Sequence, residues 1–163
     1  MSAKLTKCFF GLKEIDFVGH TVGKGKMTPR EAKVVALLAM PVPNSKKQLQ
    51  SFIGLANYFS RYIPKFADIS CNLTCLLQKS KKFIWSVEAD NSYNKIKECL
   101  TKSPVLFIAD FKKPFFIFVD ASNVAVGSAL CQLDSDDIYH PICYASHKLN
   151  NAERNYNITD REL

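Results

Sequence analysis

The chain lacks the features that mark several common classes of protein. It has six cysteines but no Cys-x-x-Cys pair and no histidine near a cysteine at zinc-finger spacing, which argues against a zinc knuckle and a dithiol redox motif. No stretch approaches the roughly eighteen apolar residues of a membrane span, and the N-terminus has no apolar signal core. We therefore expect buried thiols in a soluble protein of a reducing, intracellular compartment.

Acidic residues are few in comparison with basic ones. The 163 residues include 22 Lys and Arg against 15 Asp and Glu, which gives a formal net charge of +7. With 47% hydrophobic and 12% aromatic residues, the chain has enough apolar side chains for a packed core, so disorder is not expected. The basic excess favours a polyanionic partner such as nucleic acid; the alternative is a soluble basic domain.

The N-terminal part predicts a hairpin followed by a helix. Residues 15–22 are typical of a strand, and the glycine-punctuated residues 23–26 favour a hairpin turn after it. Thr28, Pro29 and Glu31 then combine a capping threonine, a proline at the first helical position and a glutamate three residues after the cap. This combination predicts a helix capped by Thr28 that extends to about Ala39.

The strongest helical pattern begins after Ser45. Ser45 and Gln48 form a capping box of the Ser-x-x-Gln type, and Pro64 ends the pattern. Between them, apolar residues recur at steps of three and four and predict a core-facing stripe of Leu49, Phe52, Ile53, Ala56, Phe59 and Ile63.

Another face of this helix carries Gln50, Gly54 and Tyr58 at a spacing of four, with Arg61 close by. A glycine in the middle of a helix costs roughly 1 kcal/mol relative to alanine, so something is expected to approach Gly54 closely. The residues alone leave two alternatives open, a ligand or a second helix packed against Gly54.

The remaining chain predicts helices and then strands. Apolar spacing indicates a helix over residues 66–77 and another around residues 93–100, with a soft boundary near residue 82. Strands are expected over residues 115–119, 124–132 and 139–144, with a turn at residues 135–137, and residues 159–163 are typical of the start of a helix.

Two carboxylates are placed where such a unit brings side chains together. Asp120 ends an apolar strand that we expect to be buried, and Glu162 falls on the first helix after the three strands. A helix packed across the sheet can bring the second carboxylate to the first, and convergent carboxylates require cations or donors between them. Magnesium suits such a site; the alternative is that Asp120 only caps the turn that follows it.

Several motifs, in order, resemble the reverse transcriptase of the Pol polyprotein of gypsy-class long-terminal-repeat retrotransposons. Residues 17–22 resemble the Phe-Leu-Gly-His hairpin at the end of the polymerase palm, and residues 49–64 are similar to the thumb helix. Seven further segments of this chain resemble the family's ribonuclease H region and the tether that leads into it. They are residues 83–85, 104–106, 110–111, 113–115, 119–122, 144–149 and 153–156.

The resemblance implies an α+β fold, with a palm-end hairpin and helical thumb followed by a truncated ribonuclease-H-like domain. That domain would hold a three-stranded meander and the start of a helix. The implied domains are the end of the palm (residues 1–27), the thumb (28–82), and the tether with the N-terminal part of the ribonuclease H domain (83–163).

The resemblance also implies site residues. Those implied to bind a template–primer duplex or RNA/DNA hybrid are Phe17, Gly19, His20, Gln50, Gly54, Tyr58 and Arg61. Asp120 and Glu162 would be the first two metal-binding acids of a site in which two magnesium ions hydrolyse the RNA strand. The rest of the Pol polyprotein is a further implied partner. The implied location is a virus-like particle in the cytoplasm, with the nucleus as the alternative.

The chain also departs from the family's pattern. The fingers, the palm with its paired aspartates and the later two ribonuclease H aspartates have no counterpart here, so we expect a fragment that is inactive alone. Ala125 replaces a usual glycine and Asn72 a usual proline, which suggests a decayed or divergent copy. The alternatives are a domesticated, non-enzymatic module that binds nucleic acid or protein, and an untranslated relic without a stable fold.

Overall fold

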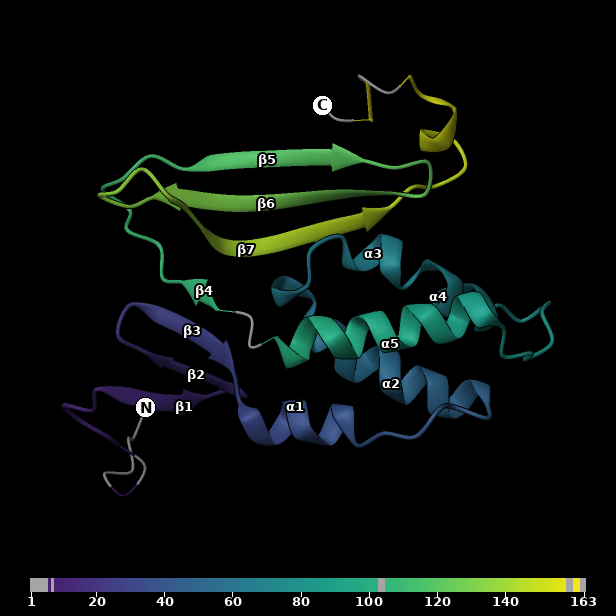
Figure 1. The fold of residues 1–163 in the computed structure, drawn as a ribbon, viewed down its shortest axis with the longest axis horizontal. Helices are drawn as coiled ribbons and strands as arrows, with labels where there is room; N and C mark the ends of the chain where they lie inside the picture. Colours follow the sequence, from purple (N-terminus) through teal and green to yellow (C-terminus); the bar gives the residue numbers. More distant parts are fainter. Residues whose placement is uncertain (1–5, 7, 103–104, 158–159, 162–163) are drawn as a thin grey trace.

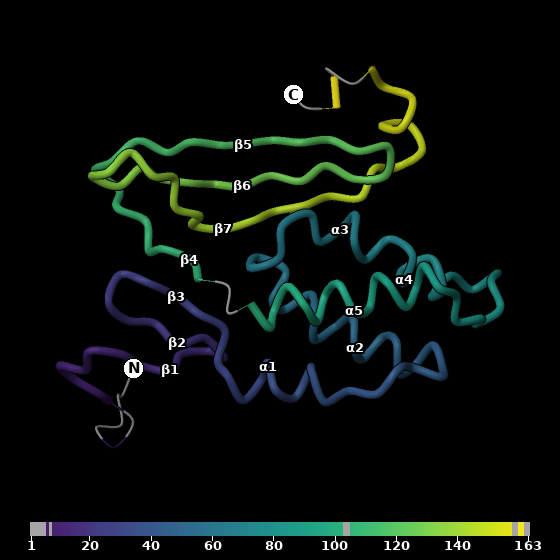
Figure 2. Tube along the Cα trace, in the orientation of Figure 1, coloured from purple at the N-terminus to yellow at the C-terminus, as the bar shows by residue number. Residues whose placement is uncertain are grey.

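The computed structural model describes residue 6 and residues 8–102, 105–157 and 160–161. It consists of a group of helices flanked by two antiparallel sheets (Figure 1). The three-stranded sheet β5-β6-β7 lies along one side of the helices, and the sheet β1-β2-β3-β4 lies near one end of the helical group (Figures 1 and 2). This arrangement confirms the predicted α+β class.

The N-terminal sheet contains two consecutive hairpins. Its strands are β1 (Glu14–Phe17), β2 (His20–Gly23), β3 (Lys26–Pro29) and β4 (Leu106–Phe107). The turn between β2 and β3 is the one predicted from the glycines. Strand β4 was not predicted, because two residues are too few to show a period, and it joins the sheet through the pairs Lys26–Phe107 and Met27–Leu106.

The helices occupy the middle of the chain. They are α1 (Glu31–Leu38), α2 (Lys46–Tyr58), α3 (Phe66–Ile69), α4 (Cys71–Leu76) and α5 (Val87–Thr101), with short 3-10 helices at Ser60–Tyr62 and Glu153–Asn155.

Helix α2 follows its sequence pattern closely. The Ser45 hydroxyl accepts a hydrogen bond from the Gln48 amide at 3.4 Å, whereas the Gln48 side chain accepts from the amide of Asn44 at 2.9 Å, one residue earlier than in a standard capping box. All predicted stripe residues are buried except Ile53, which is half-buried.

Four predicted boundaries were wrong. The strand predicted over residues 15–22 is two paired strands, β1 and β2, because the chain turns at Val18 and Gly19. Thr28 and Pro29 end strand β3, and Arg30 precedes α1 without a side-chain cap, because pairing with β2 extends the hairpin through these residues. Helix α2 ends at Tyr58, and a 3-10 turn carries the chain to Ile63. The helix predicted over residues 66–77 is two short helices that meet at Ser70.

The core lies where α2, α4 and α5 meet. Helix α5, predicted from Tyr93, Ile96 and Leu100, buries all three of these residues. The ring of Tyr93 packs against Phe52 with 4.4 Å between centroids, and its hydroxyl donates to the carbonyl of Met40 at 2.5 Å. One hydrophobic cluster therefore continues across the predicted boundary near residue 82.

The second sheet is the predicted meander of β5 (Phe116–Ala121), β6 (Ala125–Leu133) and β7 (Tyr139–Lys148). The turn at residues 135–137 is confirmed. The burial expected for β5 is not found: Ile117 is 67% exposed, Phe118 48% and Val119 41%. The reason is that β5 is an edge strand and that, among the described residues, residues 64–68 lie over only part of one of its faces.

Two expectations about composition can be compared with the described residues. None of the described helices has the length and apolar character needed to cross a membrane. Cys71 and Cys131 are buried thiols, and burial raises the pKa of Cys131.

Candidate nucleic-acid interface and the Asp120 carboxylate

The turn between β1 and β2 has a backbone that favours glycine. Val18 and Gly19 both have positive φ angles, 43° and 73°. A Cβ atom on Gly19 would lie 2.6 Å from the Tyr58 hydroxyl oxygen and 2.8 Å from Lys33 Nζ. Conformation and space therefore both favour glycine at position 19.

Aromatic residues fix this turn to the end of α2. The Tyr58 hydroxyl donates a hydrogen bond to the carbonyl of Val18, and its ring stacks on His20 with 5.2 Å between centroids. Tyr62 Oη lies 2.9 Å from His20 Nδ1. The structure therefore brings Gly19, His20 and Tyr58 together, as a junction between the hairpin and α2.

Cations surround this junction. Lys33 Nζ lies 4.3 Å from the centroid of the Tyr58 ring. Burial lowers the pKa of His20, and the charges of Arg61 and Lys33 lower it further. Burial also raises the pKa of Tyr62 to about 12. The imidazole and the phenol are thus neutral at neutral pH, while the lysine and the arginine supply positive charge.

Helix α2 presents an open face beside the junction. Lys47, Gln50, Gly54 and Asn57 are exposed at helical spacing. A Cβ atom added to Gly54 would meet no atom within 4 Å. Packing of a second helix against Gly54, one of the two alternatives, is therefore contradicted within the described residues.

The predicted binding residues are not equivalent in the structure. Gln50, Gly54 and Arg61 are exposed, and Phe17 is 65% exposed on β1. The ring and hydroxyl of Tyr58 instead contact the hairpin. Lys33 and Tyr62 were not among the binding residues predicted from the sequence. The only local signal for them was the run of aromatic residues near the end of α2.

Asp120 lies on β5, directly opposite Gly127 of β6. Its carboxylate forms an ion pair with Lys65 Nζ, and this hydrogen-bonded contact raises the pKa of Lys65. Asp120 does not cap the following turn, which was the alternative role. Ser122 does so, because its hydroxyl accepts from the amides of Val124 at 3.2 Å and Ala125 at 3.0 Å.

The described residues do not assemble a magnesium site. Glu162, the second predicted acid, lies outside them. Within the described part of the chain, no three side chains of His, Cys, Asp or Glu are grouped so that they could hold a metal ion. Asp120 therefore supplies one carboxylate whose observed partner is a lysine.

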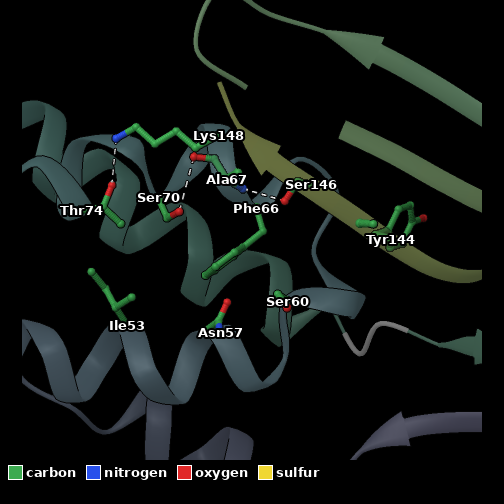
Figure 3. Close-up of a pocket in the computed structure, with 11 residues that line it drawn as sticks. Ile53, Asn57, Ser60, Phe66, Ala67, Ser70, Thr74, Tyr144, Ser146 and Lys148 are labelled. Carbon is green, nitrogen blue, oxygen red and sulfur yellow. Dashed lines mark hydrogen bonds between the residues drawn. The ribbon is translucent and has the colours of Figure 1, made fainter. Parts of the chain in front are cut away.

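A cavity separates α2 from strand β7 (Figure 3). Ile53 and Asn57 of α2 lie on one side of it, and Tyr144 and Ser146 of β7 lie on the other. Lys148 Nζ donates to Thr74 Oγ1 at 3.3 Å at the far end. This cavity marks where the helices and the sheet meet.

Comparison with known proteins finds relatives among reverse transcriptases and transposon polyproteins. Residues 85–163 match the model of the RNase H-like domain found in reverse transcriptase. The chain is 34% identical over 157 residues to the Tf2-3 and Tf2-4 transposon polyproteins of Schizosaccharomyces pombe, an alignment that covers 96% of this chain and 12% of each polyprotein.

Solved structures share the fold at lower identity. The foamy viral protease-reverse transcriptase in complex with double-stranded DNA has a TM-score of 0.77 and 22% identity, over 92% of this chain and 31% of that one. The same viral protein in complex with an RNA/DNA hybrid has a TM-score of 0.76, also at 22% identity, over 92% of this chain and 20% of that one.

Proposed function

We propose that this chain is the primer-grip hairpin, thumb and ribonuclease-H-like region of a retrotransposon reverse transcriptase, and that it binds a template–primer duplex or RNA/DNA hybrid. The match of residues 85–163 and the similarity to the Tf2 polyproteins support the first part. The second part is supported by fold neighbours that are themselves complexes with double-stranded DNA and with an RNA/DNA hybrid.

The open face of α2 carries the binding proposal. A duplex can approach the backbone at Gly54 closely because glycine has no side chain and none of the described residues covers this position. The exposed Gln50 and Asn57 offer amide groups on either side, suited to sugar and base edges. Arg61 and Lys47 are also exposed and supply positive charge for phosphates.

The hairpin junction then has a supporting role. Tyr58 and His20 position the turn at Gly19 beside α2, so that Phe17 and Lys33 stay exposed near its C-terminal end. In this proposal Tyr58 positions the hairpin, whereas Gln50, Gly54 and Arg61 contact the duplex.

Substitution of Gly54 tests the proposal. Gly54→Ala should raise the free energy of unfolding by about 1 kcal/mol, because alanine is the better helix former and its methyl group meets no neighbour. The same methyl group should weaken binding of a fluorescent RNA/DNA hybrid, measured by anisotropy, and Gly54→Leu should weaken it further. A structural role would instead lower stability and affinity together.

The control is Asn94→Ala, an exposed position of α5 away from the open face of α2. It should leave hybrid affinity unchanged. Affinity should also fall linearly with salt on logarithmic axes if Lys and Arg contacts dominate. Unchanged binding by Gly54→Leu would favour the alternative, a domesticated module that uses these helices for a protein partner.

We extend the proposal to the longer protein, which would carry out RNA-directed DNA synthesis and hydrolysis of the RNA strand of hybrids. The chain spans about an eighth of the curated relatives it matches, 12% of their length. Asp120 and Glu162 would serve as magnesium ligands there. The test is cleavage of a labelled hybrid by the longer protein, which Asp120→Asn should abolish while duplex binding persists.

A further inference from the structure

Two positively charged side chains lie at the aromatic junction between the hairpin and α2 without an acidic partner. Lys33 belongs to α1 and Arg61 to the 3-10 turn that follows α2, and both residues are exposed. Among the described residues, no carboxylate forms an ion pair with either of them. Arg30, just before α1, differs because it pairs with Asp16 at 3.1 Å.

The aromatic residues of the junction bring these two cations to one place. Lys33 Nζ lies 4.3 Å from the centroid of the Tyr58 ring, and that ring stacks on His20. Arg61 directly precedes Tyr62, whose hydroxyl oxygen lies 2.9 Å from His20 Nδ1. Burial lowers the pKa of His20 most, and the charges of Arg61 and Lys33 lower it further. His20 is therefore within reach of both positive charges.

The Lys33 side chain is held along the hairpin turn. A Cβ atom on Gly19 would lie 2.8 Å from Lys33 Nζ and 3.1 Å from Lys33 Cδ. The face of the Tyr58 ring attracts the ammonium group. Ordering a lysine costs side-chain entropy, and two like charges near each other repel. Such an arrangement suits a ligand that brings negative charge.

A duplex on the open face of α2 can reach this junction. Gly54 and Tyr58 are one helical turn apart on α2, which is about 6 Å along the helix axis. The minor groove of B-DNA is also about 6 Å wide. A duplex whose groove lies against Gly54 would therefore bring a bordering phosphate backbone to the end of α2.

We propose that Lys33 and Arg61 together bind one backbone phosphate of the duplex, and that the Tyr58 ring positions Lys33 for this contact. The ammonium supplies a compact charge, while the guanidinium can donate two parallel hydrogen bonds to the phosphate oxygens. The identity of the ligand rests on the proposed function. The site adds a residue of α1 to the face formed by α2.

The salt dependence of hybrid binding tests this site. On logarithmic axes, affinity falls with salt with a slope of about 0.9 for each phosphate contacted on B-DNA. Lys33→Gln should weaken binding of a fluorescent RNA/DNA hybrid on the order of tenfold and reduce the slope by up to about 0.9. Lys33→Arg should retain both. A purely structural role would instead lower the midpoint of thermal unfolding and leave the slope unchanged.

The control is Lys95→Gln, which removes the same charge from an exposed position of α5 and should leave the slope unchanged. Combining Lys33→Gln with Arg61→Gln tests whether the two cations share a phosphate. Sharing predicts that the double variant loses about 0.9 of slope in total, because only one phosphate contact is lost. A loss of about 1.8 would mean two separate phosphates and would overturn the shared site.

The other outcomes separate this inference from the proposed function. If hybrid binding depends on Gly54 but Lys33→Gln keeps the slope of the parent chain, only the phosphate site is overturned. If binding ignores Gly54 substitutions but Lys33→Gln lowers the slope, the open face of α2 is overturned and the phosphate site stands. Absence of any hybrid binding overturns both.

Discussion

Helix α2 and strand β5 use apolar residues in opposite ways. Leu49, Phe52 and Ala56 of α2 have no exposed surface, whereas Phe118 of β5 is 48% exposed. The difference comes from the neighbours. Helices α4 and α5 and the 3-10 turn close over the apolar stripe of α2. Among the described residues, β5 has only β6 beside it and residues 64–68 over part of one face.

This contrast shows what an apolar pattern establishes. It identifies which face of an element prefers to leave water, but burial also requires a partner surface. An exposed apolar strand next to a helical core is therefore a surface on which side-chain truncation should have little effect on the isolated chain.

The largest predicted effect tests this contrast directly. Phe52→Ala should lower the free energy of unfolding by about 3–5 kcal/mol, because it leaves a cavity beside Tyr93 in the closed core. Phe118→Ala removes the same atoms from a half-exposed site and should cost far less. Denaturant unfolding of both variants measures the difference, and equal losses would show that β5 contributes to the core as much as α2.

A smaller effect is expected where the hairpin joins α2. Gly19→Ala should cost about 1–3 kcal/mol, because alanine is strained at a φ angle of 73° and its methyl group displaces the Tyr58 hydroxyl. Thermal unfolding and the near-ultraviolet signal of the tyrosines would report this.

Gly25→Ala is the matched control, with a φ angle of 72° but no atom within 4 Å of the added Cβ. The difference between the two variants isolates the contact with Tyr58. If Gly25→Ala costs as much, backbone strain alone explains the loss, and the hairpin does not depend on the aromatic junction.

The same contrast explains which features the sequence could predict. Helices α2 and α5 were predictable because periodicity acts within each element, and the predicted Ser45 cap accepts the expected amide hydrogen bond. The start of α1 was not predictable. Thr28 locally favours a helix cap, but in the structure it pairs with a residue of β2 instead.

The candidate sites divide in the same way. The exposure of Gln50 and Gly54 follows from helical spacing. The use of Tyr58 as a hairpin contact does not, because its partner is 40 residues away in sequence. Lys65 was also unpredictable, since no local pattern announces that a left-handed lysine will reach a strand 55 residues later.

The smallest predicted effect concerns pH. Burial and the nearby Arg61 and Lys33 lower the pKa of His20 below its unfolded value of about 6.5. Between these two pKa values the unfolded chain binds more protons, so stability should be constant above pH 6.5 and fall as the pH drops toward the folded pKa. His20→Phe keeps a ring against Tyr58 and removes the titration. The pH dependence of its unfolding free energy, subtracted from that of the parent chain, cancels the other two histidines. A difference that rises as the pH falls would mean that protonated His20 stabilises the junction, contrary to the positive surroundings found here.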